Sequence, residues 1–122
     1  RIRLRGNAPA ADNYDMLPQH AHLLARVSRV TADYDAVLCP TVAITAPAIA
    51  PLERDDDLYV KTNLAVLRNT TAFNFLDRCA VSLPIHRSGE APVGLMVVGE
   101  PMADRSLLGV AAAIETLLRP AN

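Results

Sequence analysis

The chain has four serines, and a serine hydroxyl can attack a carbonyl group. Such a hydroxyl becomes a nucleophile only beside a base and a site that holds the resulting oxyanion. None of the four lies in a run of glycines that would turn the backbone sharply and present amide donors: Ser28, Ser82, Ser88 and Ser106. We therefore expect structural roles for all four and no catalytic residue in this chain.

The histidines and the acidic run give no metal site. His20 and His22 are two positions apart, so on a helix they point to different sides, and His86 stands beside a turn. The acidic run at residues 55–57 lacks the alternating ligands and the glycine of a calcium loop. We expect no bound metal and no cofactor.

Cysteines and glycines exclude other site classes. Cys39 and Cys79 are forty positions apart without a CxxC pair, which predicts buried free thiols. The five glycines are scattered singly, which excludes a phosphate-binding loop and a dinucleotide fingerprint. Gly94 and Gly99 bracket an apolar run. They mark either a close approach beside a ligand cavity or tight packing against the helix that follows.

Composition places the chain among ordinary globular proteins. It has 122 residues, 51% of them apolar and 20% charged, with a net charge of −1. A nearly neutral chain has no field that would gather nucleic acid or an anionic membrane, although arginines cluster at residues 1–5. Its apolar runs are shorter than the ~20 residues that cross a bilayer, and no signal peptide is visible. We expect a single cytoplasmic segment, 1–122. Because it begins at Arg1, we expect it to be a piece of a longer protein.

Periodicity predicts alternating helices and strands. Residues 41–57 combine prolines, small residues and acids, and are expected to form a loop. Residues 79–85 and 93–98 are separated by turn formers and predict a β-hairpin. The remaining elements are a helix over 12–33, a buried strand over 36–39, a helix over 60–76, and a last helix beginning at Asp104.

The apolar positions predict which faces are buried. The run at 36–39 has no polar side, which is typical of an interior strand in a parallel or mixed sheet. Leu95 and Val97, or Met96 and Val98 if the register is shifted by one, should lie in the core. The expected helix faces are Leu23, Val27, Val30 and Tyr34; Leu64, Leu67, Thr71 and Phe75; and Leu107, Val110, Ala111, Ile114 and Leu118.

Three stretches, in this order, resemble the closing section of the amidase signature family: 34–41, 74–84, and 92–99 with Asp104 and Leu107-Leu108 behind it. The resemblance implies an α/β/α sandwich with a mixed sheet, of which this chain would be the incomplete C-terminal segment with its β-hairpin and helix. It implies amide hydrolysis by a Ser–cis-Ser–Lys triad that precedes the segment. Lys61 does not match the family lysine, so no catalytic residue is carried over. Arg1 is a substrate-binding candidate, from a faint match to an arginine-bearing stretch of the family.

The sequence also departs from one branch of that family. Amidotransferase A subunits usually carry a glycine and a proline where this chain has Asp77 and Cys79, so a stand-alone amidase is the favoured interpretation. The expected function is cleavage of a small carboxamide by the parent enzyme, with this segment inactive alone. The alternatives are a catalytically silent packing or dimerisation module and an amidotransferase A subunit. Self-association, or packing against the rest of the parent, is expected.

Overall fold

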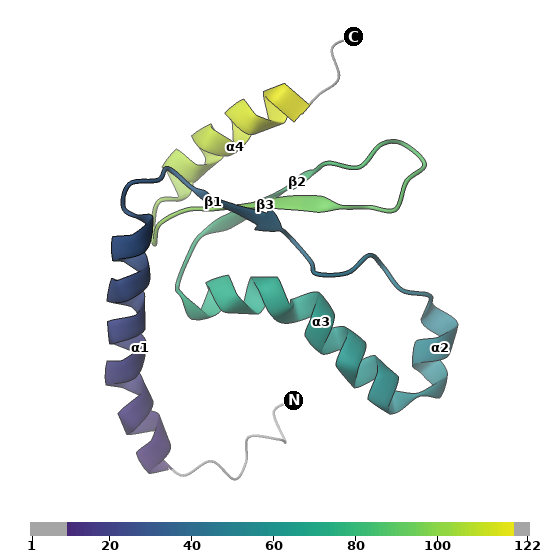
Figure 1. Cartoon of the computed structure of the whole chain (residues 1–122), viewed down its shortest axis with the longest axis horizontal. Helices are drawn as coiled ribbons and strands as arrows, with labels where there is room; N and C mark the ends of the chain where they lie inside the picture. Colours follow the sequence, from purple (N-terminus) through teal and green to yellow (C-terminus); the bar gives the residue numbers. More distant parts are fainter. Residues whose placement is uncertain (1–9, 119–122) are drawn as a thin grey trace. The chain divides into compact units, whose positions relative to one another are not determined.

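A computed structural model describes residues 10–118, with side chains from residue 16 onward. The chain divides into two compact units between Asp33 and Tyr34, and each is described by itself. The described elements are, in order, α1 (Ala10–Thr31), β1 (Val37–Pro40), α2 (Ile49–Arg54), α3 (Asp56–Phe75), β2 (Ala80–Pro84), β3 (Gly94–Val98) and α4 (Asp104–Leu118) (Figure 1).

Among its described residues, the first unit consists of one helix, α1, which confirms the helix expected over 12–33. Pro18 lies inside it rather than in its first turn. Of the expected apolar face, Leu23 and Val27 are half-buried, but Val30 is 73% exposed. Tyr34 belongs to the second unit and is also exposed.

A three-stranded antiparallel sheet in the order β1-β3-β2 is the centre of the second unit. The expected hairpin is confirmed, because β2 pairs with β3 and Val81 lies opposite Val97. On the other side of β3, β1 pairs with it and Leu38 lies opposite Val97. The described strands pair only antiparallel, so no parallel neighbour of β1 is among them. In this chain β1 is an edge strand, and Leu38 is 53% exposed.

Helix α4 closes one face of the sheet. Val97 of β3 is fully buried, and it forms the core with Leu83, Leu107 and Ala111. Val110 and Ile114 pack against that core, which confirms the expected stripe except for the exposed Leu118. Gly99 lies in this layer too. A Cβ there would be 3.3 Å from Cβ of Leu107, so the tight-packing interpretation of this glycine is correct.

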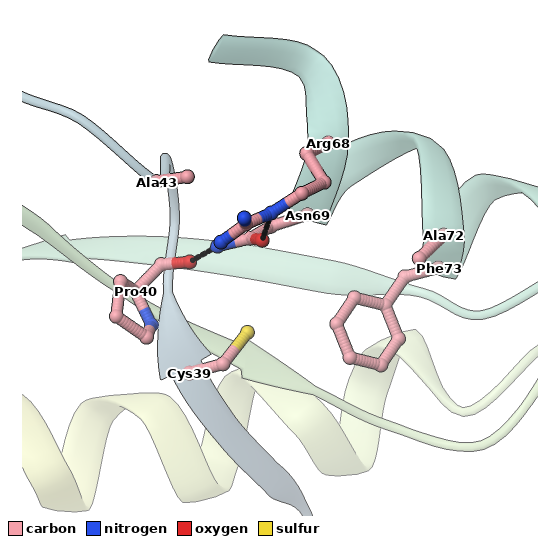
Figure 2. Close-up of a pocket in the computed structure, with 7 residues that line it drawn as sticks. All are labelled: Cys39, Pro40, Ala43, Arg68, Asn69, Ala72 and Phe73. Carbon is pink, nitrogen blue, oxygen red and sulfur yellow. Dashed lines mark hydrogen bonds between the residues drawn. The ribbon is translucent and has the colours of Figure 1, made fainter. Parts of the chain in front are cut away.

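Helix α3 lies on the opposite face, so the sheet stands between α3 and α4 (Figures 1 and 2). Alternation along β3 puts Met96 and Val98, 3% and 2% exposed, on the face opposite Val97. The core expectation for β3 is therefore confirmed for Val97, Met96 and Val98, whereas Leu95 is only half-buried. Each face of this small sheet is covered by a helix, which gives the α/β layering expected of the fold class.

The face predicted for α3 is wrong except at Leu67, which is half-buried. Leu64 and Phe75 are 55% and 52% exposed, and Thr71 is exposed as well. Val66 and Phe73 are half-buried instead. No residue of α3 is fully buried, so its amphipathic pattern is weak and the choice of face depends on which neighbours the fold supplies.

Residues 41–57 are not one loop, because α2 forms and α3 begins at Asp56. Pro51 stands in the first turn of α2, where its missing amide hydrogen is not needed by the helix. The side chain of Asp55 accepts from Leu58 N at 2.9 Å, and Asp56 and Asp57 occupy the first turn of α3. The acidic run is a helix start, stabilised by capping and by the helix dipole.

The end of α3 turns into β2 through a left-handed residue. Asp77 has φ +52°; its amide donates to Asn74 O, and the amide of Arg78 donates to Phe73 O. This pair of bonds is the Schellman arrangement, whose left-handed position favours glycine. The glycine expected at this position in amidotransferase subunits thus has a physical reason, and Asp77 occupies a strained position.

Candidate functional site

A cavity of about 420 Å³ opens between β1 and α3, on the face of the sheet opposite α4. Figure 2 shows its lining: Cys39, Pro40, Ala43, Arg68, Asn69, Ala72 and Phe73. The strand contributes Cys39 because its side chain alternates to the α3 side of the sheet. The helix contributes positions 68, 69, 72 and 73, which share one side at i, i+1, i+4 and i+5.

The polar wall of the cavity is held by Asn69. Its Nδ2 donates to the carbonyl oxygen of Pro40 at 2.8 Å, which ties α3 to the end of β1. Its Oδ1 accepts from Nε of Arg68 at 3.4 Å, a long and therefore weak hydrogen bond. Arg68 is exposed at the rim, and no carboxylate within residues 16–118 forms an ion pair with it. Its guanidinium can therefore bind an anionic group of a ligand.

The rest of the lining is mainly apolar. Figure 2 shows the Cys39 thiol and the Phe73 ring on the cavity side of β1 and α3. Burial raises the pKa of the Cys39 thiol above its usual value. A thiol with a raised pKa stays protonated near neutral pH, and the thiolate is the nucleophilic form. Cys39 is therefore suited to contact a ligand rather than to attack it.

A second polar cluster lies where β1 ends. Thr41 Oγ1 and Ser82 Oγ are 2.5 Å apart, and Thr41 N donates to Gly94 O at 2.8 Å. A Cβ on Gly94 would lie 2.5 Å from Ser82 Oγ and 2.7 Å from Thr41 Oγ1, so this glycine allows a close approach. All three line a more open hollow of about 290 Å³. The cavity interpretation of Gly94 therefore agrees with the structure.

The structure distributes the other candidate residues rather than gathering them. Ser82 is paired with Thr41, a hydroxyl and not a base. Ser88 and Ser106 are exposed, and Ser28 lies in α1 of the other unit. His86 Nδ1 lies 3.3 Å from both N and O of Val93 in the hairpin. Lys61 is exposed on α3, and Arg1 lies outside the described residues.

No group of three or more metal-ligating side chains suited to an ion occurs among the described residues. The described helices also include none that is both long and apolar enough to traverse a lipid bilayer.

Sequence reasoning missed Arg68 and Asn69 as cavity residues. Neither belongs to the apolar face that the sequence predicts for α3, and the structure contradicts most of that face. One signal was available: Arg68, Asn69, Ala72 and Phe73 stand at i, i+1, i+4 and i+5, the spacing of one side of a helix. Helical spacing groups these residues, but only the position of β1 makes their side a cavity.

The second unit is a layered α/β unit with a cavity at the end of its edge strand β1. A family model described as Amidase matches residues 1–108, which is most of the chain. The chain belongs to the amidase family, as the motif order predicted.

Characterised relatives include amide-cleaving and amide-transferring proteins. The chain is 34% identical over 95 residues to a 2-amino-5-chloromuconic acid deaminase from Comamonas testosteroni, covering 77% of this chain and 20% of that protein. It is 34% identical over 87 residues to a fatty acid amide hydrolase from Arabidopsis thaliana, covering 70% and 14%. It is 30% identical over 89 residues to the A subunit of the glutamyl-tRNA(Gln) amidotransferase from Thermotoga maritima, covering 73% and 18%.

The matches thus span one fifth or less of each of these relatives. No solved structure gives a significant match to the chain.

Proposed function

We propose that this chain forms part of a cytoplasmic hydrolase that cleaves the C–N bond of a small carboxamide, and that it supplies sheet and one wall of the substrate cavity. Membership of the amidase family supports amide chemistry. The small share of each relative that the chain matches supports a partial role in the reaction.

The observation that carries the proposal is the separation of binding features from reactive ones. The cavity at β1 and α3 offers a guanidinium, an amide and apolar walls. In contrast, the Ser82 hydroxyl is bonded to Thr41, and Lys61 is exposed elsewhere on α3. A cavity wall without an activated nucleophile needs that nucleophile from another part of the enzyme.

The first test is direct assay of the 122-residue chain on aryl amides and esters. We expect no turnover above background, because the Ser82 hydroxyl is bonded to the Thr41 hydroxyl rather than to a base, and no serine lies in a run of glycines that could present oxyanion donors. Turnover that disappears on Ser28→Ala, Ser82→Ala, Ser88→Ala or Ser106→Ala would contradict this proposal.

A second test asks whether the chain can serve in a complete enzyme. The section of the Arabidopsis fatty acid amide hydrolase that matches this chain is replaced by this chain's residues. We expect a chimera that melts cooperatively and hydrolyses amides. The control is the same chimera with Val97→Asp, which places a charge in the core between β3 and α4 and should lose both properties. A well-folded chimera without turnover would argue for the silent packing module.

The amidotransferase alternative is supported by the Thermotoga relative. In this alternative the parent protein would cleave an amide as well, but it would deliver the ammonia to a partner. Asp77 and Cys79 stand against this alternative, as they depart from the usual glycine and proline. A neighbouring gene for a partner protein would favour it.

We also propose that the chain self-associates or packs against the rest of its parent, and that nucleic acid and membranes are not its partners. β1 and β2 are both edge strands, and open edges invite further pairing. Large apolar side chains such as Ile49, Tyr59 and Leu64 are more than half exposed. Light scattering at micromolar concentration should show species larger than a monomer, and a stable monomer would refute this.

A further inference from the structure

We infer that the cavity between β1 and α3 is a binding site for a small organic carboxylate with an apolar body, oriented by Arg68. The cavity would hold one end of the substrate, so this inference rests on the proposed function. It names the substrate class: carboxamides that carry a carboxylate away from the amide.

The positive charge of Arg68 at the rim of the cavity favours an anionic ligand. Arg68 has one hydrogen-bond partner in the described part of the chain, and that bond uses only its Nε at 3.4 Å. The terminal nitrogens keep the planar donor pair that matches a carboxylate in two parallel hydrogen bonds. Asn69 stabilises this arrangement, since its bond to Pro40 O fixes the amide beside the guanidinium.

The remaining walls argue for an apolar body on that anion. Ala43, Ala72 and the Phe73 ring face the volume, together with the protonated Cys39 thiol. Small side chains at 43 and 72 leave room for a ring, and Phe73 offers a flat face to it. Pockets of about 300–1,000 Å³ with apolar walls and a few polar groups are typical of small-molecule sites, and this cavity is within that range.

The thiol of Cys39 gives a direct readout of occupancy. Cys39 lines the cavity, whereas the Cys79 thiol donates to Glu100 O at 3.1 Å and is absent from the lining. A ligand in the cavity should slow alkylation of Cys39 and leave Cys79 unchanged. Both rates are measured on the same molecules by mass spectrometry with neutral iodoacetamide, at protein concentrations low enough to limit self-association.

The probes are benzoate, benzamide and benzylamine, which share a ring and differ in charge. We expect benzoate to protect Cys39 at concentrations at least tenfold lower than benzamide, and benzylamine not to protect it. Arg68→Gln should abolish the tenfold preference, and Arg68→Glu should transfer it to benzylamine. The matched control is Arg87→Gln, an exposed arginine in the hairpin turn, which should leave the preference unchanged.

A further variant tests the apolar half of the site. Ala72→Phe fills the cavity from α3 at a position that is exposed in the free chain. We expect it to remove protection by every probe, with circular dichroism confirming that the fold is kept. Equal protection by benzoate and benzamide, or an Arg68→Gln variant that keeps the preference, would overturn the inference.

These measurements read binding without turnover. Protection with no activity in the chimera would refute the hydrolase and keep the carboxylate site. Activity in the chimera without selective protection of Cys39 would refute the carboxylate site and keep the hydrolase.

Discussion

The two faces of the sheet in the second unit are built differently. On the α4 face, Val97 is fully buried, and Leu107 and Ala111 fill the space above it. On the α3 face, the strand residues Met96 and Val98 are buried too, but no residue of α3 is fully buried, and a cavity remains beside the hydrogen bond from Asn69 to the strand. The α4 face is closed, and its filled core stabilises the fold. The α3 face is open, and it leaves the Arg68 guanidinium and apolar walls for a ligand. Packing and binding are therefore divided between opposite sides of the same strands.

The largest effect is expected from a substitution in the core between the sheet and α4. Leu107→Ala should lower the free energy of unfolding by about 2–5 kcal/mol, because it leaves a cavity in a filled core. On α3, Leu64→Ala should cost less than about 0.5 kcal/mol, since Leu64 is 55% exposed. Denaturant unfolding measures both. Similar losses for the two variants would show that the faces do not differ in packing.

The next effect concerns the ion pair that joins the start of β2 to the segment after β3. The Arg78 side chain is 4% exposed and pairs with Glu100. Glu100→Gln keeps the shape but removes the negative charge that Glu100 presents to the buried Arg78 side chain. We expect a loss of about 1–3 kcal/mol, below the range for a fully buried pair because Glu100 is 40% exposed. Glu53→Gln on exposed α2 is the control, and equal effects would remove any special role for the pair.

A smaller effect should stabilise the chain, at the turn that joins α3 to β2. Asp77→Gly relieves a left-handed residue, with an expected gain of about 0.5–1 kcal/mol. Asp77→Ala should be less stable than the original chain, because alanine tolerates positive φ less well than aspartate. If the midpoint of thermal unfolding falls in the order glycine, aspartate, alanine at position 77, from highest to lowest, the strain is confirmed. Any other order contradicts it.

The smallest effect is expected at Gly94, beside the Ser82 and Thr41 hydroxyls on the open face. Gly94→Ala should push the Ser82 and Thr41 hydroxyls apart and lose a hydrogen bond worth about 0.5–1.5 kcal/mol. The gain of about 0.5–1 kcal/mol from replacing a strand glycine offsets most of this. A double-mutant cycle with Ser82→Ala isolates the contact. Strictly additive changes would mean that the glycine is not needed for the hydroxyl pair.

Local patterns were sufficient for most of the elements. Apolar periodicity predicted α1, α3 and α4, and turn formers between two β-prone runs predicted the hairpin. Motif order predicted the family. The start of α3 was missed because an acidic run was interpreted as a loop, although Asp55 and two following acids are also a helix-start signal.

By itself, the sequence determined what depends on neighbours along the chain: helix and strand positions, the hairpin, the stripe of α4, and the motifs that match the amidase family. Only the tertiary structure decided which strand lies beside β3, which side of α3 faces the sheet, and that Arg68 meets Cys39 across a cavity. The physical reason is that edge pairing and helix docking are selected by contacts between distant segments. The weakly amphipathic α3 carries too little pattern of its own to specify its inner side.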